Sequence, residues 1–356
     1  MTRQLLVSCA AAAMLAACSG GSQTPSAPLV QNPTATGAAK HPMIPSPAVR
    51  NVAARLNHGK SWISPDAMNA PRLLFISDYG AGAVDIFTMP ALVLKGQLTG
   101  FSSPEGECSD TSGNIWIANT GALELQLYSR TGTLLKTLSD SYGYPASCAL
   151  DKNGNLAVAN IESSTAGAGS IVVYANASGN GTVYTNSAFY QYFFVAYDPN
   201  GNLFFDGTNS SRTSSYLAEL PAGSSNTVLI SLSGGTLSLA GFVQWYRAGN
   251  YLALGDQTCG ANFSCVYWVT VSGSSGTITG TTSLGDYEDY EVCDLVQGVI
   301  AANGERYLAG MDYEANCGFT PTSTANRWRW DAGGTPTNYN NTASFVEPIG
   351  SAISTK

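Results

Sequence analysis

Short apolar runs return along this chain, each placed directly after a tight turn signal. The most regular run is Ile115–Asn119, which follows the turn Asp110–Asn114. In such a turn an aspartate can accept hydrogen bonds from nearby backbone and a glycine can adopt positive φ, so the chain reverses between two strands. With its flanking segments, the run predicts a four-stranded meander at Glu105–Asp110, Ile115–Asn119, Leu125–Ser129 and Leu134–Leu138.

Copies of this turn and run recur at long intervals. With the residue that closes each turn as the marker, the copies fall at positions 72, 113, 154, 201, 249 and 304, which are 41, 41, 47, 48 and 55 residues apart. A spacing of about 40 to 50 residues, with several strands in each repeat, indicates the blades of a β-propeller. Six markers predict six blades.

The C-terminal segment predicts how the ring closes. Phe345–Ile353 is similar to Phe101–Ser109, which leads into an innermost strand. The first blade has no such segment of its own, so we expect the last strand to complete it and to pair the two ends of the domain. The predicted fold is all-β: a six-bladed β-propeller over residues 72–354, closed by a C-terminal strand.

The predicted second strands all end in a polar residue. A ring of polar residues on one face could form a binding site, but equivalent positions in every repeat more often cap turns. We therefore interpret this set as structural: Asp78, Asn119, Asn160, Asp206, Asp256 and Asp312.

The segment Gly113–Asn119 supports a family resemblance. Its sequence Gly-Asn-Ile-Trp-Ile-Ala-Asn resembles the NHL-repeat and SMP-30/gluconolactonase-like six-bladed propellers, in which Gly-x-[Leu/Ile]-[Tyr/Trp]-[Val/Ile]-[Ala/Thr]-Asp marks the second strand of a blade. The resemblance covers residues 72–210 and decays beyond them. It implies a propeller, and for the SMP-30-like members a divalent-metal-dependent lactonase activity.

The first eighteen residues have the pattern of a secretory signal. Arg3 precedes an apolar run that ends in Leu15–Cys18, and small residues before a cysteine resemble the lipobox of bacterial lipoproteins. The resemblance implies a signal peptide over 1–17 and lipid attachment at Cys18, with Ser19 favouring the outer membrane of the cell envelope. The alternative is an ordinary secretory signal cut nearby. The apolar run is shorter than the ~20 residues that span a bilayer, and the Pro-rich stretch 18–71 predicts a low-complexity tether.

Charge and histidine content exclude several function classes. The formal net charge is −8, whereas nucleic-acid binding needs clustered Lys and Arg. Both histidines, His41 and His58, precede the repeats. The predicted propeller therefore lacks a Ser-His-Asp triad and an imidazole metal cage. Its larger aromatic residues are expected mostly to pack in the core: Trp245, Tyr246, Trp268, Trp328 and Trp330.

Six cysteines follow the predicted signal and anchor. In an oxidising compartment they suggest disulfides, although many connectivities are possible. A shift of one 41-residue repeat places Cys148 at the position equivalent to Glu107, one residue from Cys108. The two thiols therefore point to opposite faces of their strands and can meet between neighbouring innermost strands. Local bridges would then join Cys259 to Cys265 and Cys293 to Cys317. The spacing lacks a C-x2-C pair, so metal binding by these thiols is the weaker alternative.

Carboxylates gather in the loops expected at the channel face. Converging carboxylates suit Ca²⁺ or another divalent cation, and Glu105-Gly106 resembles the Glu-Gly of SMP-30-like lactonases, whose glutamate helps to hold a divalent metal. The alternative is a set of hydrated acidic loops. The candidate metal ligands are Glu105, Glu107, Glu288, Asp289, Glu291 and Glu347.

These observations leave two functional hypotheses. The first is a membrane-anchored, non-enzymatic binding module without a cofactor, monomeric, whose channel face binds a protein, peptide or glycan and no nucleic acid. The second is a divalent-metal-dependent lactonase or related hydrolase of the SMP-30-like type that uses Glu105 and its neighbours.

Overall fold

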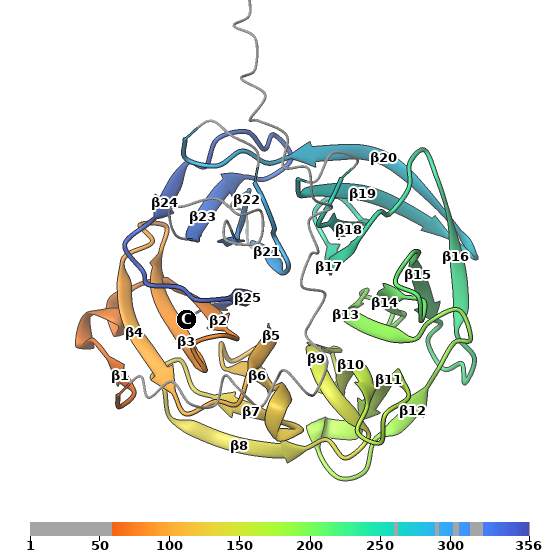
Figure 1. Ribbon diagram of the computed structural model, residues 1–356, viewed down its shortest axis with the longest axis horizontal. Coiled ribbons are helices and arrows are strands. Elements are labelled where there is room, and N and C mark those ends of the chain that lie inside the picture. Colours follow the sequence, from red (N-terminus) through yellow and green to blue (C-terminus); the bar gives the residue numbers. More distant parts are fainter. Residues whose placement is uncertain (1–58, 260–262, 289–291, 302–305, 314–322, 356) are drawn as a thin grey trace, which may run out of the picture. The chain divides into compact units, whose positions relative to one another are not determined.

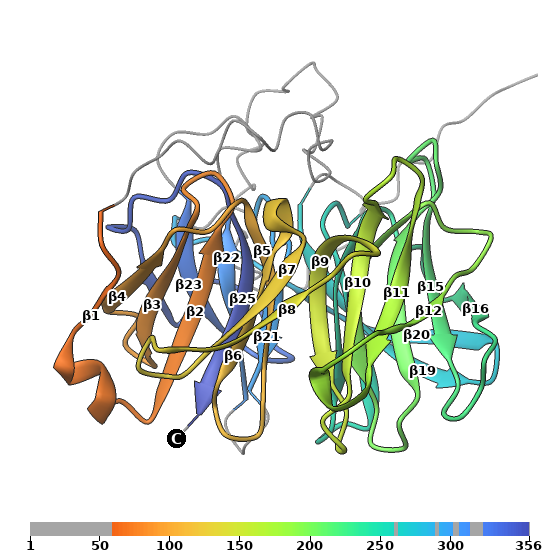
Figure 2. The same ribbon diagram turned by 90° about the horizontal axis from the view of Figure 1, so that it is seen from below.

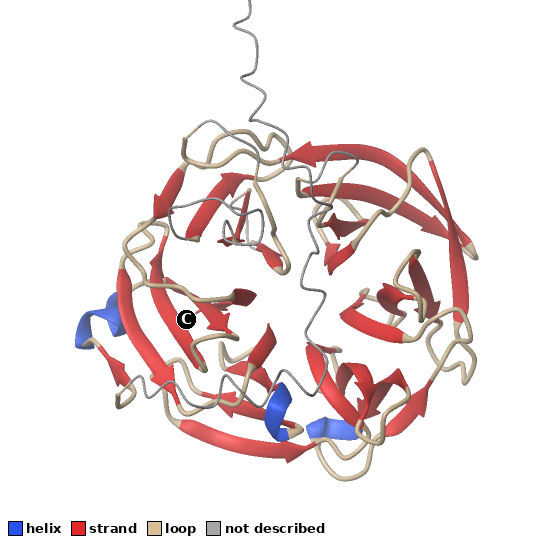
Figure 3. Ribbon diagram, viewed as in Figure 1, coloured by secondary structure: helices blue, strands red, loops and turns tan. Residues whose placement is uncertain are grey.

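The computed structural model describes residues 59–259, 263–288, 292–301, 306–313 and 323–355. All of them belong to the second of the chain's two units, Ala39–Lys356. Within these ranges the only helices are three short 3-10 turns, η2 (Pro65–Asn69), η3 (Thr120–Ala122) and η4 (Ala175–Ala177), and strands make up most of the rest (Figure 3). The all-β prediction is confirmed.

The strands form five sheets built from four-stranded antiparallel meanders. The first contains β1 (Trp62–Ile63), β2 (Arg72–Asp78), β3 (Ala83–Met89), β4 (Leu94–Thr99) and β25 (Pro348–Thr355). The second contains β5 (Pro104–Ser109), β6 (Ile115–Asn119), β7 (Glu124–Tyr128) and β8 (Leu134–Ser139). The third contains β9 (Gly143–Leu150), β10 (Leu156–Ser163), β11 (Ala168–Tyr174) and β12 (Thr182–Tyr184).

The remaining strands make one large sheet and one small sheet. The eight-stranded sheet contains β13 (Gln191–Tyr197), β14 (Leu203–Thr208), β15 (Ser215–Leu220), β16 (Val228–Ser233), β17 (Ala240–Tyr246), β18 (Tyr251–Asp256), β19 (Cys265–Ser272) and β20 (Ser275–Ser283). The last sheet contains β21 (Gly298–Ile300), β22 (Tyr307–Asp312), β23 (Thr324–Arg329) and β24 (Asn338–Asn340).

The sheets stand side by side around a common axis in a propeller-like arrangement (Figures 1 and 2). The innermost strands contact one another in cyclic order, β25, β5, β9, β13, β17, β21 and back to β25. The C-terminal strand β25 pairs antiparallel with β2 along its whole length, from Arg72 opposite Thr355 to Asp78 opposite Pro348. The expected pairing of the two ends is confirmed.

The eight-stranded sheet joins two consecutive meanders through their outer strands. β16 and β20 pair in parallel over three residues, from Ser231 opposite Ser275 to Ser233 opposite Thr277. Each strand thereby covers the open edge of the other, and open edges are the places where sheets aggregate. The sequence pattern did not predict this junction.

The Asp-x-x-Gly-Asn turns have the hydrogen bonds that the sequence indicates. The Asp110 carboxylate accepts two backbone N–H groups at 2.8 Å each, and the Asn114 amide donates to its second oxygen at 2.8 Å. Gly113 adopts φ +78°. The copies at 151–155 and 198–202 repeat this arrangement. In the weaker copy at 249 the left-handed residue is Asn250 (φ 54°), one position later than expected.

Two of the expected disulfides are present in the described residues. Cys108 on β5 is bonded to Cys148 on β9 with their Cα atoms 5.6 Å apart, and Cys259 is bonded to Cys265 at the same Cα distance. Cys293 is also disulfide-bonded, while its predicted partner Cys317 lies outside the described residues. These bonds fit an oxidising, extracytoplasmic compartment.

The aromatic residues pack in the core, as expected from the sequence. Trp328 and Trp330 are fully buried in the largest apolar cluster together with Tyr246, and Trp245 and Trp268 pack against its side. Trp330 contacts the rings of Tyr246 and Trp268 at centroid distances of 5.6 and 6.3 Å. These rings therefore stabilise the fold.

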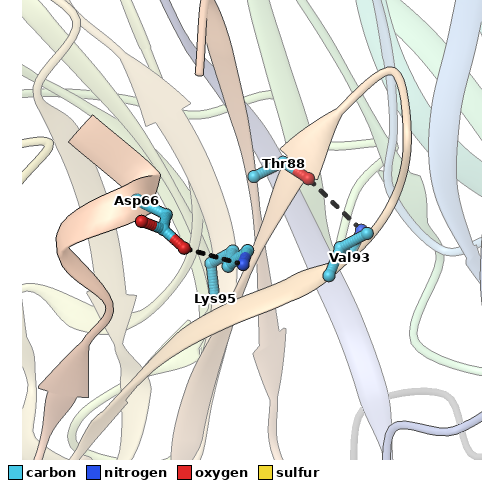
Figure 4. Close-up of polar contacts among 4 residues, drawn as sticks. All are labelled: Asp66, Thr88, Val93 and Lys95. Atoms are coloured by element: carbon cyan, nitrogen blue, oxygen red, sulfur yellow. Dashed lines mark hydrogen bonds and ion pairs between the residues drawn. The ribbon is translucent and has the colours of Figure 1, made fainter. Parts of the chain in front are cut away.

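The folded part begins before residue 72. β1 pairs with the outer strand β4, and η2 packs beside it with Ala67 buried. Figure 4 shows the ion pair that holds η2 to β4, between Lys95 and Asp66 at 3.4 Å. Thr88 and Val93 close the neighbouring turn through a 3.4 Å hydrogen bond. The end of the predicted tether thus covers the edge of the first meander.

Candidate functional site

The loops that lead into the innermost strands meet at one end of the ring. We call them lead-in loops; in the described residues they include 100–103, 140–142, 185–190, 234–239, 292–297 and 341–347. One polar residue at or near the end of each second strand bonds to the lead-in loop or innermost strand of its own meander. The bond is made by a side-chain oxygen or amide group, and it is present in all six meanders. The residues are Asp78, Asn119, Asn160, Asp206, Asp256 and Asp312. Two of the six lie before the end of the strand, contrary to the sequence prediction, because β10 continues to Ser163 and β14 to Thr208.

Asp78 illustrates how these side chains are used. Its carboxylate accepts the backbone N–H groups of Val346 and Glu347 at 2.7 and 2.8 Å, and that of Ala81 at 3.0 Å. Charge-assisted hydrogen bonds of this kind are about twice as strong as neutral ones. The capping interpretation is confirmed, with one refinement: the caps hold the lead-in loops and so fix the innermost strands.

Acidic groups face one another where the first and last meanders meet. Burial, and then the Asp78 charge, raise the pKa of Glu347 to about 7. Burial also raises the pKa of Tyr313, and Glu347, Asp78 and Asp294 reinforce that shift. We call Asp78, Asp294, Tyr313 and Glu347 the acidic seam. Further ionisation within the acidic seam is therefore unfavourable.

Asp85, on β3, provides a measurable consequence of this environment. Burial raises its pKa to about 6 and the Asp78 charge adds to the rise, although Gln97 donates a 2.8 Å hydrogen bond. The folded state keeps this proton up to a higher pH than the unfolded state, so stability falls as pH rises from about 4 to about 6. Asp85→Asn should remove that fall, which amounts to roughly 3 kcal/mol at most. Urea unfolding of both proteins at about pH 4 and about pH 7 measures it; identical pH profiles would contradict the assignment.

Glu105 and Glu107, the leading metal candidates, are buried within the ring. Their side chains are 1% and 2% exposed. Burial raises the pKa of Glu107 well above its ordinary value, and the Ala352 amide only partly opposes this. A Cβ atom on Gly106 would lie 2.5 Å from the Ala146 carbonyl oxygen. The glycine of the Glu-Gly pair is thus required by the close packing of β5 on β9.

A glutamine that no sequence pattern marks bridges three innermost segments. The Gln297 side-chain oxygen accepts the N–H groups of Glu107 and Ser351 at 2.9 Å each, and its amide nitrogen donates to the Glu107 carbonyl at 2.8 Å. Gln244 similarly exchanges two hydrogen bonds with the backbone of Ile300. Both amides satisfy backbone groups on strand edges that face the axis. No motif marks either residue, since their partners are backbone groups far along the chain.

Of the other four metal candidates, the structure describes Glu288 and Glu347. Glu288 is exposed and its backbone N–H bonds to Asp286 at 2.9 Å. Glu347 belongs to the acidic seam. Asp289 and Glu291 lie outside the described residues. Across the part of the chain that the structure describes, no group of three or more His, Cys, Asp or Glu side chains is placed to hold a metal ion.

Comparisons with known proteins find a shared fold among solved structures and no family. No protein-family profile matches the sequence, and no curated protein matches it. Among solved structures, the chain is similar to a protein of unknown function from Bacteroides caccae, with a TM-score of 0.57 and 14% identity over 81% of this chain and 100% of that one. It is also similar to Kuenenia stuttgartiensis hydrazine synthase, with a TM-score of 0.52 and 15% identity over 77% and 79% of the two chains.

A third similar structure is a catalytically inactive virginiamycin B lyase from Staphylococcus aureus with quinupristin, at a TM-score of 0.48 and 12% identity over 82% and 91% of the chains. The first two likenesses show a shared fold and say nothing about activity. The ring of sheets described above makes the chain a propeller-like all-β protein, and its described residues contain disulfides. In the described residues, no helix is long and apolar enough to cross a membrane.

Proposed function

We propose that this chain is an exported lipoprotein whose six meanders form a six-bladed β-propeller, and that its lead-in face binds a protein, peptide or glycan without chemical change. In this proposal the eight-stranded sheet counts as two blades joined at β16 and β20, and the propeller resembles the NHL-repeat proteins. Cys18 carries the lipid, and residues 18–71 connect it to the ring. We place the protein in the cell envelope, at the outer membrane, as a monomer.

The observation that carries the binding proposal is the use of the polar side chains at the lead-in face. Asp78, Asp206, Asp256 and Asp312 accept backbone N–H groups from lead-in loops or innermost strands, which occupies at least one oxygen of each carboxylate. The lead-in loops differ in length and sequence between meanders, while the ring beneath them repeats. Variable loops on a rigid scaffold are the usual basis of a binding surface.

The same observations weigh against the alternative of a metal-dependent lactonase. A hard cation prefers several ionised oxygens at one point. Glu107 has a raised pKa and packs between innermost strands, and Gly106 has a packing role that explains the Glu-Gly pair. The lactonase hypothesis would need Glu105 and its neighbours to converge on one cation together with Asp289 and Glu291, which lie outside the described residues.

A metal titration of the mature chain discriminates the two functions. We expect no saturable heat with Ca²⁺ or Zn²⁺ in calorimetry, and no lactone hydrolysis with either ion supplied. Glu105→Gln serves as the matched variant, because it keeps the side-chain shape and removes the charge. Stoichiometric metal binding that Glu105→Gln abolishes, together with metal-dependent hydrolysis, would establish the enzyme instead.

The anchor is tested through Cys18. The chain isolated from membranes should carry the mass of a diacylglycerol thioether on Cys18, and Cys18→Ser should release the protein from the membrane fraction. Acyl chains contribute about 0.8 kcal/mol for each buried methylene, so their loss should move almost all of the protein from the membrane fraction to the soluble fraction. Unchanged membrane association of Cys18→Ser, with no added mass on the original chain, would refute lipid attachment.

A further inference from the structure

An extended segment of the chain lies along the outer edge of the first meander. This segment, residues 59–70, contains β1 and η2, and we call it the strap. β1 pairs antiparallel with β4, and Ile63 lies opposite Gly96. Peptides bind to an open sheet edge in the same way, because the edge supplies backbone hydrogen bonds to an added strand. The strap therefore shows what kind of chain the β4 edge holds.

Two glycines make room for the Ile63 side chain beside β4. A Cβ atom on Gly96 would lie 2.9 Å from Ile63 Cγ1, and a Cβ atom on Gly132, in the turn before β8, would lie 2.6 Å from Ile63 Cδ1. Ile63 also packs against the apolar cluster that contains the buried Leu98. We call this space, between the first two meanders, the Ile63 socket. Backbone pairing accepts many sequences, so the socket is the part of the edge that selects an aliphatic side chain.

Hydrogen bonds hold the strap on both sides of the Ile63 socket. Towards the start of the strap, the Thr99 N–H donates to the Ser61 hydroxyl at 3.0 Å, and the Thr99 hydroxyl donates to the Gly59 carbonyl at 3.1 Å. Beyond the socket, the Ser64 N–H donates to the Lys95 carbonyl at 2.7 Å. Two of these bonds use backbone groups of the strap and the third uses a serine hydroxyl. Another strand with a hydroxyl at that position could therefore make all three.

The strap is held more weakly than the strands of the ring. Its ladder with β4 has two residue pairs, whereas the ladder of β25 with β2 has seven. Ala67 is the only buried residue of the strap, and the ion pair of Asp66 with Lys95 leaves Asp66 exposed (Figure 4). Exposed ion pairs contribute about 0–1 kcal/mol, and segments with few buried contacts open at a low free energy. The strap should therefore detach while the ring stays folded.

From these contacts we propose that the β4 edge and the Ile63 socket form a second binding site, which accepts an extended strand from a partner protein. The strap covers this site, and the partner strand replaces the strap. The strand that fits places a β-branched aliphatic side chain in the socket and a serine or threonine two residues before it, as the strap does with Ile63 and Ser61. β1 and β4 lie at the outside of the ring (Figures 1 and 2), so the lead-in face stays open to its own ligand.

Binding of a strap peptide to the mature chain tests this site. The probe is a fluorescein-labelled synthetic peptide of residues 59–70, and its binding is followed by fluorescence anisotropy. The chain with Ile63→Asp, whose own strap would place a carboxylate in the apolar socket, should bind the peptide saturably. The unaltered chain should bind it with roughly tenfold lower affinity, because its site is open for only a fraction of the time. A peptide that itself contains Ile63→Asp should bind neither chain.

Two further substitutions, each made in the Ile63→Asp chain, locate the site. Gly96→Val fills the socket and should abolish binding, whereas Val183→Asp, at an exposed position of the outer strand β12, should leave the affinity unchanged. Near-UV circular dichroism checks that each ring is folded, and the comparison of the two peptides on the unaltered chain needs no altered protein.

Three results would overturn the inference. They are no binding of the strap peptide to the unaltered chain, equal binding of the two peptides, and binding that survives Gly96→Val. A concentration-dependent dimer of the unaltered chain that Ile63→Asp abolishes would also overturn it, because the strap of a second copy would then be the occupant.

Discussion

Removal of residues 342–356 is expected to abolish the cooperative fold. The deletion takes away β25, whose ladder with β2 runs from Arg72 to Asp78, and the buried side chains of Ile349 and Ile353. It also takes away both lead-in amides that Asp78 binds, which leaves a buried carboxylate without its main partners. The free energy of unfolding of a domain is only about 5–15 kcal/mol. We expect the loss of an innermost strand to cost more than this.

Thermal unfolding followed by near-UV circular dichroism measures this effect. The deleted chain should lack the near-UV signal and any sharp transition. A synthetic peptide of residues 342–356, added in excess, should restore both, because binding to the folded state stabilises it by mass action. A truncated chain with the transition temperature of the intact protein would show that β25 does not close the ring.

Gln297→Leu is expected to cause a large loss of stability. The change removes three hydrogen bonds to the backbone of Glu107 and Ser351. Those backbone groups are buried, and each unsatisfied group costs about 1–3 kcal/mol. The expected loss is about 3–6 kcal/mol, which approaches the whole stability of an ordinary domain.

Two other glutamines calibrate that prediction. Gln244→Leu removes two backbone hydrogen bonds and should cost less than Gln297→Leu. Gln126→Leu breaks only half-buried contacts with Glu124 and Tyr128 and should cost about 1 kcal/mol or less. Urea unfolding of the three variants should rank them in this order, and a Gln297→Leu loss no larger than that of Gln126→Leu would show that the bridge does not hold the inner strands.

The repeating part of this fold is predictable because it depends on local chemistry. The turn Asp110–Asn114 determines where one strand ends and the next begins, and the predicted strand Ile115–Asn119 coincides with β6. The repeat length alone brought Cys108 and Cys148 together, since it places them on adjacent innermost strands. The similarity of Phe345–Ile353 to an earlier lead-in segment was enough to predict the pairing of β25 with β2.

The features that the sequence did not predict depend on distances that no local pattern records. Gln297 binds a strand 190 residues away in the chain, so nothing near it marks its role. The parallel pairing of β16 with β20 joins residues more than 40 positions apart in the chain, from two different meanders. For the carboxylates, the sequence indicates which loops contain acids. It does not indicate that Asp78 and Asp312 bind lead-in amides, or that Glu105 and Glu107 are buried.

The central claim is that the acidic side chains at the lead-in end of the ring hold the fold and do not bind a metal. A crystal structure of the mature chain grown with excess Ca²⁺ tests it most directly, because it also covers Asp289 and Glu291. We predict that Asp78 binds the amides of Val346 and Glu347 and that no cation lies between Glu105, Glu107 and Glu347. A Ca²⁺ ion coordinated by those carboxylates, with the amide bonds to Asp78 broken, would contradict the account.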